Sequence, residues 1–269
     1  MSIRIYADTD ILLQEGYSEY EIDTDRDLEV TFRGAGVCDA FIRVVRCGKL
    51  RIRTFAEAGA VISYLFWNST EEVLNVDESH EVLGDAAVTV AYGECNSAPT
   101  ERKTYVALRQ QGASAKVASA SLVNAKKTYN IKVANLAPHT YGDMENYAVV
   151  LKGGKLMIDA VGKIVNGAYK SESHQTSRAL CFDEGQSSQI LPELLIDEND
   201  VQASHAMSIG RMDEDQLYYM MSRGLNVQQC TSLISTGYLM PITETLQNED
   251  LRSALRNEME RKISELCSM

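Results

Sequence analysis

The sequence has few of the features that mark secreted, membrane or nucleic-acid-binding proteins. It contains four prolines and one tryptophan among 269 residues. No apolar run approaches the roughly 20 residues that a membrane-spanning helix needs. Its 26 basic and 38 acidic side chains give a net charge of -12, which would repel nucleic acid and an anionic membrane surface. The N-terminus shows no signal-peptide pattern. We therefore expect a cytoplasmic protein that binds neither nucleic acid nor membranes.

The cysteines are scattered and include no CxxC pair. Their distribution lacks the spacing of a zinc site or of a ferredoxin-type cluster. In a reducing compartment most should be free thiols. Apart from Cys181, we expect each to be a small buried hydrophobic residue: Cys38, Cys47, Cys95, Cys230 and Cys267.

Common signatures of catalysis are missing as well. The sequence has no Gly-x-x-x-x-Gly-Lys-Ser/Thr loop, so this chain should bind no nucleotide, and any ATP hydrolysis must be done by a partner. It also has no GxSxG elbow and no HExxH helix. The glycines of KGGK, residues 152–155, form a plain turn between two apolar strands.

Short runs of alternating apolar residues fill the chain from about residue 28 to residue 209. Glycine or polar turns separate them, as in FIRVVRCGKLRIRTF and KLMIDAVGKIV. In LRIRTF, Leu50, Ile52 and Thr54 share one face, and Arg51 and Arg53 share the other, which is typical of a half-buried strand. The spacing predicts a mainly β protein, but it fits a sandwich or a parallel β-helix equally well.

After Gly210 the periodicity becomes helical. Asp213 can cap the N-terminus of a helix that ends before Gly224. Glycine there adopts the left-handed backbone conformation of a helix end at little energetic cost. A second helix should run between Asn226 and Gly237.

A third helix should begin near Asn248. We expect Glu258 and Lys262 to pair on one of its faces. Another face carries an apolar stripe of Leu251, Leu255, Met259, Ile263 and Leu266. The sequence thus predicts a β core over residues 1–210 and a helical region over residues 211–269.

The segment NDVQASHAMSIGRMDEDQLYYMMSRGL joins these two regions and carries the leading candidate for chemistry. Residues 201–209 read as a short strand that Gly210 ends, with His205 among small neighbours. Imidazole is a good iron ligand and titrates near neutral pH. From the residues alone, His205 is either a metal ligand or a histidine that closes the end of the β core.

This part of the chain resembles the C-terminal region of the SufB/SufD family, the scaffold proteins of SUF-type iron–sulfur cluster assembly. The resemblance rests on GKIVNGA, QTSR, PELLIDENDV, the SH pair and DEDQLYYMMSRG, in this order between Gly162 and Gly224. It implies a right-handed parallel β-helix core with a C-terminal α-helical region. Because the chain is shorter than typical members, we expect by this resemblance the compact form of the family, without the N-terminal helical portion of those members.

The resemblance also implies a scaffold that is not an enzyme. Its partners would be a SufC-like ABC-type ATPase and a second SufB/SufD-like chain, in a homodimer or a heterodimer, and its cargo a transient iron–sulfur cluster. The ATPase is expected on the first helix, at Tyr218, Arg223 and Gly224, since Arg223 has a donor fork suited to an interface. Arg223 stabilising its own helix dipole is the alternative.

In the family, the histidine that matches His205 is implicated in cluster assembly between two scaffold subunits. Three departures weaken the match. Ala206 replaces the acidic residue of B-type members, Ala203 replaces the cysteine of some D-type members, and no cysteine stands near Gln175 or Thr176, where B-type members have one.

Cys181 is the nearest thiol and the second candidate ligand. It precedes His205 by 24 residues, about one β-helix turn, so we expect the two to come close on adjacent rungs, although its apolar neighbours suggest burial. His174 should lie in an exposed turn, and His80 and His139 look incidental.

Two alternatives remain open. The chain is a structural partner of the same complex without cluster ligands, as the missing acid and cysteine suggest. Less favoured is a carbohydrate-active β-helix protein, which the single tryptophan and the lack of an evident carboxylate pair on a strand face oppose.

Overall fold

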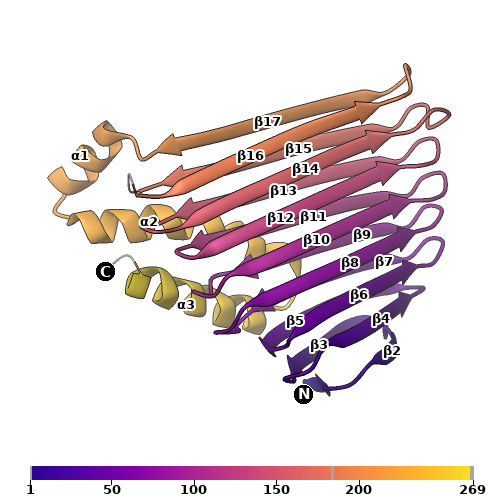
Figure 1. The fold of residues 1–269 in the computed structure, drawn as a ribbon, viewed down its shortest axis with the longest axis horizontal. Coiled ribbons are helices and arrows are strands. Elements are labelled where there is room, and N and C mark those ends of the chain that lie inside the picture. The colour runs from indigo at the N-terminus through magenta and orange to yellow at the C-terminus, as the bar shows by residue number, and fades with distance from the viewer. Residues whose placement is uncertain (1, 183–184, 267–269) are drawn as a thin grey trace.

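The computed structural model describes residues 2–182 and 185–266, which form two parallel β-sheets and a helical region beside them (Figure 1). Successive strands alternate between the sheets. Sheet A contains β1 (Ile3–Ile5), β3 (Gly16–Asp23), β5 (Val37–Arg46), β7 (Val61–Asn68), β9 (Ala87–Glu94), β11 (Ser114–Val123), β13 (Tyr141–Val150), β15 (Glu172–Cys181) and β17 (Gln202–Arg211). Sheet B contains β2 (Thr9–Leu12), β4 (Leu28–Gly34), β6 (Lys49–Ala56), β8 (Leu74–Val82), β10 (Thr100–Leu108), β12 (Lys126–Asn135), β14 (Lys155–Ile164) and β16 (Ser187–Ile196).

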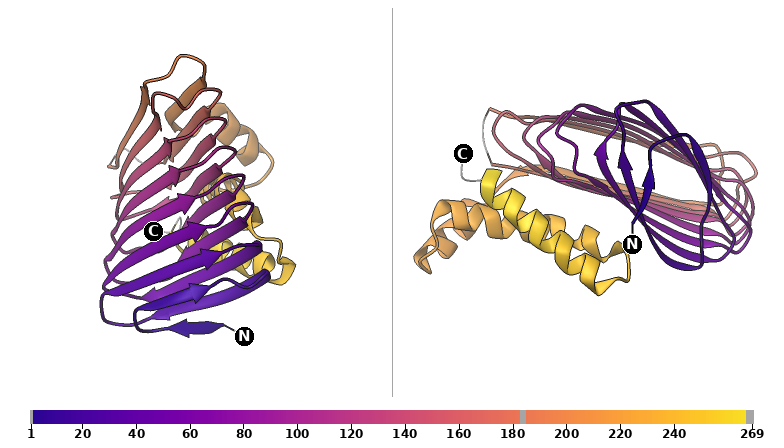
Figure 2. Two further views of the ribbon diagram at one scale, coloured as in Figure 1. Left: turned by 90° about the vertical axis from the view of Figure 1, so that its right-hand side faces the viewer. Right: turned by 90° about the horizontal axis from the view of Figure 1, so that it is seen from below.

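Within each sheet the strands stack in chain order and pair in parallel, so the chain coils through both sheets in turn (Figure 2). Apart from one register shift at the end of β3, successive strands pair without interruption; for example, Lys116, Asp143 and His174 lie side by side on β11, β13 and β15. The inner faces of the two sheets enclose one continuous apolar core. The mainly β class and the parallel β-helix are therefore confirmed, and the sandwich is wrong.

Side chains alternate across the coil as the sequence predicted. In β6, Leu50, Ile52 and Thr54 are buried inside, and Arg51 and Arg53 are exposed outside. Because neighbouring strands pair in register, a residue that points inward lies against inward residues above and below it. This rule fixes which face each candidate residue occupies.

The helices α1 (Glu214–Ser222), α2 (Val227–Leu239), η1 (Met240–Thr245, a 3-10 helix) and α3 (Glu249–Leu266) follow the last strand. The prediction of helices only beyond residue 210 is thus confirmed for the described chain. None of these helices is both long and apolar enough to cross a membrane. The strands end at Arg211, near the expected boundary between core and helical region; that these are separate domains stays a prediction.

α2, η1 and α3 lie along the outer face of sheet A (Figures 1 and 2). The apolar stripe of α3 is confirmed, since Leu255, Met259 and Ile263 are fully buried there. These side chains complete a second apolar core with residues of the sheet and of α2 and η1, among them Phe41, Leu65, Trp67, Leu122, Val149, Leu239 and Ile242.

Two helical predictions are wrong. α2 does not stop at Gly237 but continues to Leu239, which is fully buried in the second core; that burial offsets the roughly 1 kcal/mol that a helical glycine costs. Glu258 pairs with Arg43 of β5 and not with Lys262, because packing of α3 turns this carboxylate toward the sheet.

The cysteines are buried as expected. Cys38, Cys47, Cys95 and Cys230 are free thiols with little or no exposure. Burial raises the pKa of Cys47 to about 11 and that of Cys95 to about 12, so neither is a ready thiolate at neutral pH. Cys267 lies outside the described residues.

Candidate functional site

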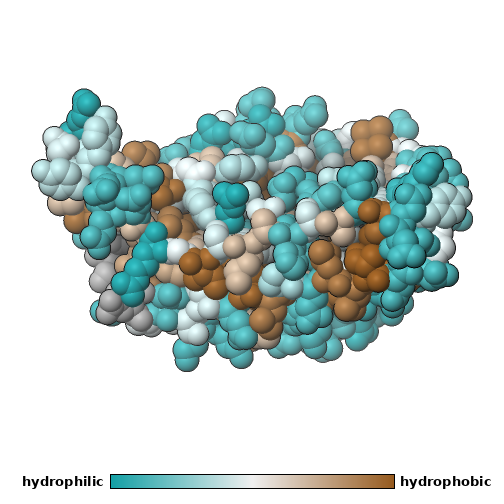
Figure 3. Space-filling model, turned by 90° about the horizontal axis from the view of Figure 1, so that it is seen from above, coloured by the Kyte–Doolittle hydropathy of each residue, from teal (hydrophilic) through white to brown (hydrophobic). Residues whose placement is uncertain are grey.

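The last rung of the coil, made by β16 and β17, is not covered by another rung. All ten residues of β17 are exposed, whereas β15 beneath it is largely buried on its inner face. Large apolar side chains are left in solvent on this rung: Leu191, Leu195, Ile196, Met207 and Ile209. Figure 3 looks onto this end, where hydrophobic groups lie between hydrophilic ones. An open pair of strand edges with exposed apolar groups is a surface suited to pairing with another chain.

His205 lies on this last rung, in the middle of β17 and not at its end. The strand continues through Gly210 to Arg211, so the prediction that Gly210 ends it is wrong. A Cβ at Gly210 would meet nothing within 4 Å. The backbone of Gly210 pairs with that of Leu180 of β15 and so continues the parallel ladder. Helix α1 starts only three residues after Arg211, at Glu214.

Gln175 is the neighbour of His205 in the ladder and was not identified as a site residue from the sequence. Gln175 is 2% exposed and points into the coil, so the in-register His205 lies on the same inner face, above it. The Gln175 Nε2 donates to the Glu193 carbonyl oxygen at 2.7 Å, and its buried Oε1 has no partner among the described residues. An unpaired buried carbonyl therefore lies beside His205 at the open end.

Gly162 of β14 makes room for this arrangement. A Cβ there would lie 2.3 Å from Ser173 Oγ and 3.0 Å from Gln175 Nε2. Any larger side chain would push Gln175 away from its place beside β16. The first glycine of GKIVNGA thus has a steric role next to the candidate site.

Cys181 does not meet His205. It pairs in register with Arg211, six residues along β17 from His205. At about 3.3 Å per residue the two side chains are about 20 Å apart along the strand. Cys181 is also 2% exposed, with its Sγ 3.6 Å from Ser188 Oγ. The expectation that the two come close on adjacent rungs is therefore wrong, and the described part of the chain contains no group of three or more His, Cys, Asp or Glu side chains arranged to hold a metal ion.

His174 is in strand β15 and not in an exposed turn. Its Nδ1 lies 2.7 Å from Ser204 Oγ of β17, and its Nε2 lies 3.2 Å from Glu172 Oε2. These three side chains share the outer face of sheet A, opposite His205 and Gln175. His174 thus helps to hold the last strand in place.

α1 extends beyond the strands at the corner of the molecule (Figure 1) and buries no residue. Its N-cap is confirmed, because Asp213 accepts hydrogen bonds from the amides of Asp215 and Gln216. Tyr218 is 75% exposed, and the Arg223 guanidinium stacks 5.1 Å from the centre of the Tyr219 ring.

The C-terminus of α1 has the expected cap. Gly224 takes a φ of +94°, a conformation that favours glycine, and its amide donates to the Met221 carbonyl. Tyr218 and Arg223 are therefore presented on a capped, solvent-exposed helix.

A network of buried charges inside the coil was not predicted. Glu78, Glu94, Arg102 and Lys127 are all at most 3% exposed. Arg102 Nη2 donates to Glu94 Oε1 at 2.5 Å, and Lys127 Nζ lies 3.6 Å from Glu94 Oε2. The signal is present in TERKTYVAL and KKTYNIKVAN, where Arg102 and Lys127 take inward positions of the alternation.

His80 belongs to this network and is not incidental. It is fully buried, with its Nε2 3.5 Å from Glu78 Oε2. Burial by itself raises the pKa of Glu78, but hydrogen bonding and charge from His80, together with the charge of Arg102, outweigh it and lower that pKa to about 2. Glu78 is therefore ionised in the folded protein at neutral pH.

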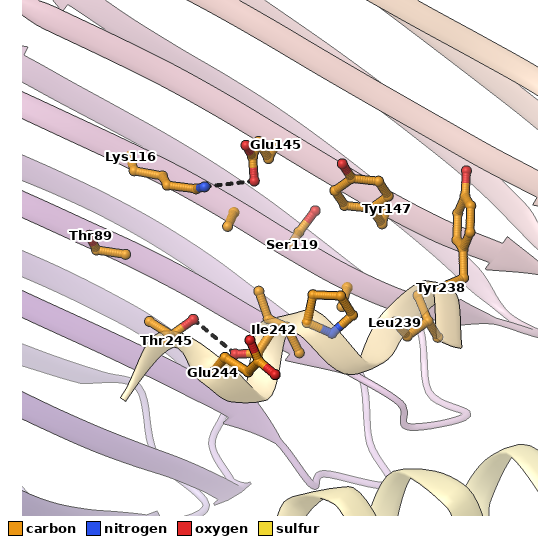
Figure 4. Close-up of a pocket in the computed structure, with 13 residues that line it drawn as sticks. Thr89, Lys116, Ser119, Glu145, Tyr147, Tyr238, Leu239, Ile242, Glu244 and Thr245 are labelled. Carbon is orange, nitrogen blue, oxygen red and sulfur yellow. Dashed lines mark hydrogen bonds and ion pairs between the residues drawn. The ribbon is translucent and has the colours of Figure 1, made fainter. Parts of the chain in front are cut away.

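A cavity of about 300 Å³ separates sheet A from η1 (Figure 4). One wall carries the ion pair between Lys116 Nζ and Glu145 Oε2, 2.7 Å apart. Tyr147 and Tyr238 meet edge to face at the other side, with ring centres 5.5 Å apart. Among the described residues, the lining contains neither histidine nor cysteine, the side chains that suit iron best, so we do not count this cavity as part of the candidate cluster site.

Comparison with known protein families agrees with this architecture. Residues 45–238 match the family model described as SUF system FeS cluster assembly, SufBD core domain. The matched region runs from the end of β5 to α2 and includes the last rung with His205 and Gln175.

Curated proteins show the same similarity. The iron–sulfur cluster assembly protein SufD of Bacillus subtilis is 32% identical over 229 residues, covering 73% of this chain and 52% of that protein. SufB of the same organism is 26% identical over 135 residues, covering 49% of this chain and 29% of that protein. SufD of Escherichia coli is 28% identical over 104 residues, covering 39% and 25%. The chain thus spans at most about half the length of these relatives.

Proposed function

The chain belongs to the SufB/SufD family of SUF-type iron–sulfur cluster assembly proteins, and from this membership we propose that it is a scaffold on which such clusters are assembled. The observation that carries the proposal is the open last rung, where His205 lies beside the buried, unpaired Gln175 Oε1. The family match covers this rung. The scaffold binds its cargo and catalyses no reaction itself.

His205 is the iron ligand of this site. A neutral imidazole donates a nitrogen lone pair to iron, and every described position of β17 is open to solvent, so a cluster can reach it. Gln175 Oε1 accepts a hydrogen bond from the imidazole or from a ligand that completes the iron coordination. One chain supplies one imidazole here, so the site is weak and its cluster is transient.

Self-association completes the site. When two copies pair through the open edges of β16 and β17, two His205 side chains approach one symmetry axis. The exposed Met207 and Ile209 are removed from water in the same step. A second SufB/SufD-like chain pairs in the same way in the heterodimeric alternative.

An ABC-type ATPase docks on α1. Tyr218 offers an exposed aromatic ring, and Arg223 offers a charged donor fork, next to the fixed turn at Gly224. None of the residues of α1 is buried against the rest of the chain, so a partner can bind this helix without displacing contacts within the protein. We also place the chain in the cytoplasm, with the ATPase.

The second candidate function is a structural subunit without cluster ligands. The separation of Cys181 from His205 supports it, because the only cysteine proposed as a ligand is buried and lies about 20 Å away. In that case a partner chain holds the cluster.

Anaerobic reconstitution with iron, a sulfide source and an ABC-type ATPase distinguishes the two functions. The scaffold function predicts iron and acid-labile sulfide bound in excess of that bound by the ATPase alone, and unchanged content for Cys181→Ser. If the complex holds no more cluster than the ATPase alone, the structural function replaces the proposal.

A further inference from the structure

A polar cavity of about 530 Å³ lies at the seam between the β core and α3. We call it the seam cavity. The core contributes Arg43 of β5, residues 68–71 at the end of β7 and just after it, and residues 95–98 after β9, while α3 contributes Glu258, Arg261 and Lys262. It lies far from His205 in the fold, since these segments belong to rungs much nearer the N-terminus.

The floor of the seam cavity is rigid and polar. Asn68 and Asn96 are 4% and 5% exposed. Asn68 Nδ2 donates to Glu94 Oε2 at 2.7 Å, and Asn96 Oδ1 accepts from the fully buried Lys127 Nζ at 2.5 Å. The floor is therefore fixed to the buried charge network and cannot collapse to fill the cavity.

The hydroxyl groups of the cavity are held as donors. Ser69 Oγ accepts from Arg43 Nη1 at 2.7 Å, and Ser97 Oγ accepts from Asn124 Nδ2 at 2.9 Å. Since each oxygen already accepts a hydrogen bond, its own O–H remains free to donate. Two hydroxyl groups that are free to donate therefore belong to the lining of the cavity.

The charge of the lining favours an anion. Three cations stand against two carboxylates in this lining, and of the cations Arg43 pairs with Glu258 and Arg261 pairs with the exposed Glu265. Glu258 is already satisfied, because its oxygens accept from Arg43 and from Trp67 Nε1. Glu71 lies in an exposed loop, and Lys262 makes no ion pair with any described residue.

We propose that the seam cavity binds a small multivalent oxyanion, bearing phosphate or carboxylate groups, that bridges α3 to the β core. Charge-assisted hydrogen bonds come from Lys262 and Arg261 on the helix and from Ser69 and Ser97 on the core. Because the ligand contacts both parts, its binding stabilises the docked position of α3. This site is independent of the proposed scaffold function.

The test uses the full chain with pyrophosphate and, separately, citrate, each against sodium chloride at matched ionic strength. Isothermal titration calorimetry measures binding, and hydrogen exchange measures protection of α3. We expect saturable one-to-one binding of at least one anion at millimolar concentration. Which of the two binds tells whether phosphate or carboxylate is preferred.

Three variants decide the outcome. Lys262→Ala should weaken binding about tenfold, and Ser97→Asp, which places a carboxylate at an exposed position, should abolish it. Lys103→Ala, on the opposite sheet and 60% exposed, is the matched control and should bind like the wild type. Thermal unfolding of each variant shows that it is folded. Non-saturable binding overturns the proposal. So does binding that Lys262→Ala and Ser97→Asp leave unchanged, and so does binding that all three variants weaken by the same factor.

Discussion

Glu258 of α3 accepts a forked ion pair from Arg43 of β5, joining residues 215 positions apart in sequence. The same carboxylate accepts a hydrogen bond from Trp67 Nε1 at 2.9 Å. Both side chains of the ion pair are about a quarter exposed, so solvent weakens the interaction but does not remove it. This contact fastens the C-terminal helix to sheet A beside the second apolar core.

We predict that Glu258→Ala lowers the free energy of unfolding by about 1–2 kcal/mol, because it leaves Arg43 and the Trp67 N–H without their acceptor. Urea denaturation measures the change. Glu265→Ala is the control, since its pair with Arg261 is exposed on both sides and should matter by less than about 0.5 kcal/mol. Equal effects of the two substitutions would show that the contact with sheet A has no special role.

The buried network should respond more strongly. Arg102→Met removes the cation that Glu78 and Glu94 share and leaves Glu94 only Lys127, so we expect a loss of about 3–5 kcal/mol in the free energy of unfolding. The double variant Arg102→Met with Glu94→Gln should recover part of that loss, because one stranded charge is gone. Arg109→Met, in an exposed pair with Glu81, is the control. Denaturant midpoints that are the same for all three proteins would contradict this account.

Stability should also fall in acid. In the folded protein the pKa of Glu78 is lowered from 4.5 to about 2. Burial raises this pKa, but the interactions with His80 and Arg102 lower it by more. A lowered folded-state pKa stabilises the protein above pH 4.5, and that contribution is lost as the pH falls toward 2. Glu78→Gln should flatten the dependence of unfolding free energy on pH in this window. A slope as steep in the variant as in the wild type would rule out Glu78 as a source.

The open last rung gives a prediction about self-association. Met207→Glu and Ile209→Glu place charges on exposed side chains of β17 and should shift a dimer toward monomer in analytical ultracentrifugation. Val73→Glu, at another exposed apolar position outside the strands, is the control and should leave the association unchanged. Variants of β17 that associate as tightly as the wild type would exclude this edge as the interface.

Docking of the ATPase is best tested with point variants of α1. Truncation at residue 210 would uncover apolar side chains of sheet A, such as Leu122 and Val149, and so confuse binding with misfolding. Tyr218→Ala and Arg223→Ala change only an exposed helix and should reduce co-purification of an ABC-type ATPase. Tyr6→Ala, which removes a ring that is 72% exposed near the N-terminus, should not. Undiminished co-purification with both α1 variants would place the ATPase elsewhere.

Local patterns in the sequence predicted much of the fold. The alternation in LRIRTF, the cap at Asp213 and the stripe of α3 each depend on residues close in sequence, and all are confirmed. The coil itself could not be derived that way, because its rungs share no exact repeat and in-register pairing is a long-range property. Only the family resemblance pointed to it.

The site was harder to predict for the same reason. His205 and Gln175 are neighbours because of the register between β15 and β17, which no local pattern reveals. Cys181 was placed near His205 from a sequence distance, yet a shift of six positions along the strand separates them. Arg102 and Lys127 look like solvent-facing charges until opposite charges from other rungs are known to lie beside them.

Anaerobic reconstitution of the chain with an ABC-type ATPase tests most directly, through bound iron and visible absorbance, whether His205 holds the cluster. We predict that His205→Ala assembles far less cluster than the wild type while keeping its fold. His139→Ala, which removes a histidine from the turn between β12 and β13, should match the wild type. If His205→Ala is folded and assembles as much cluster as the wild type, the ligand assignment is wrong.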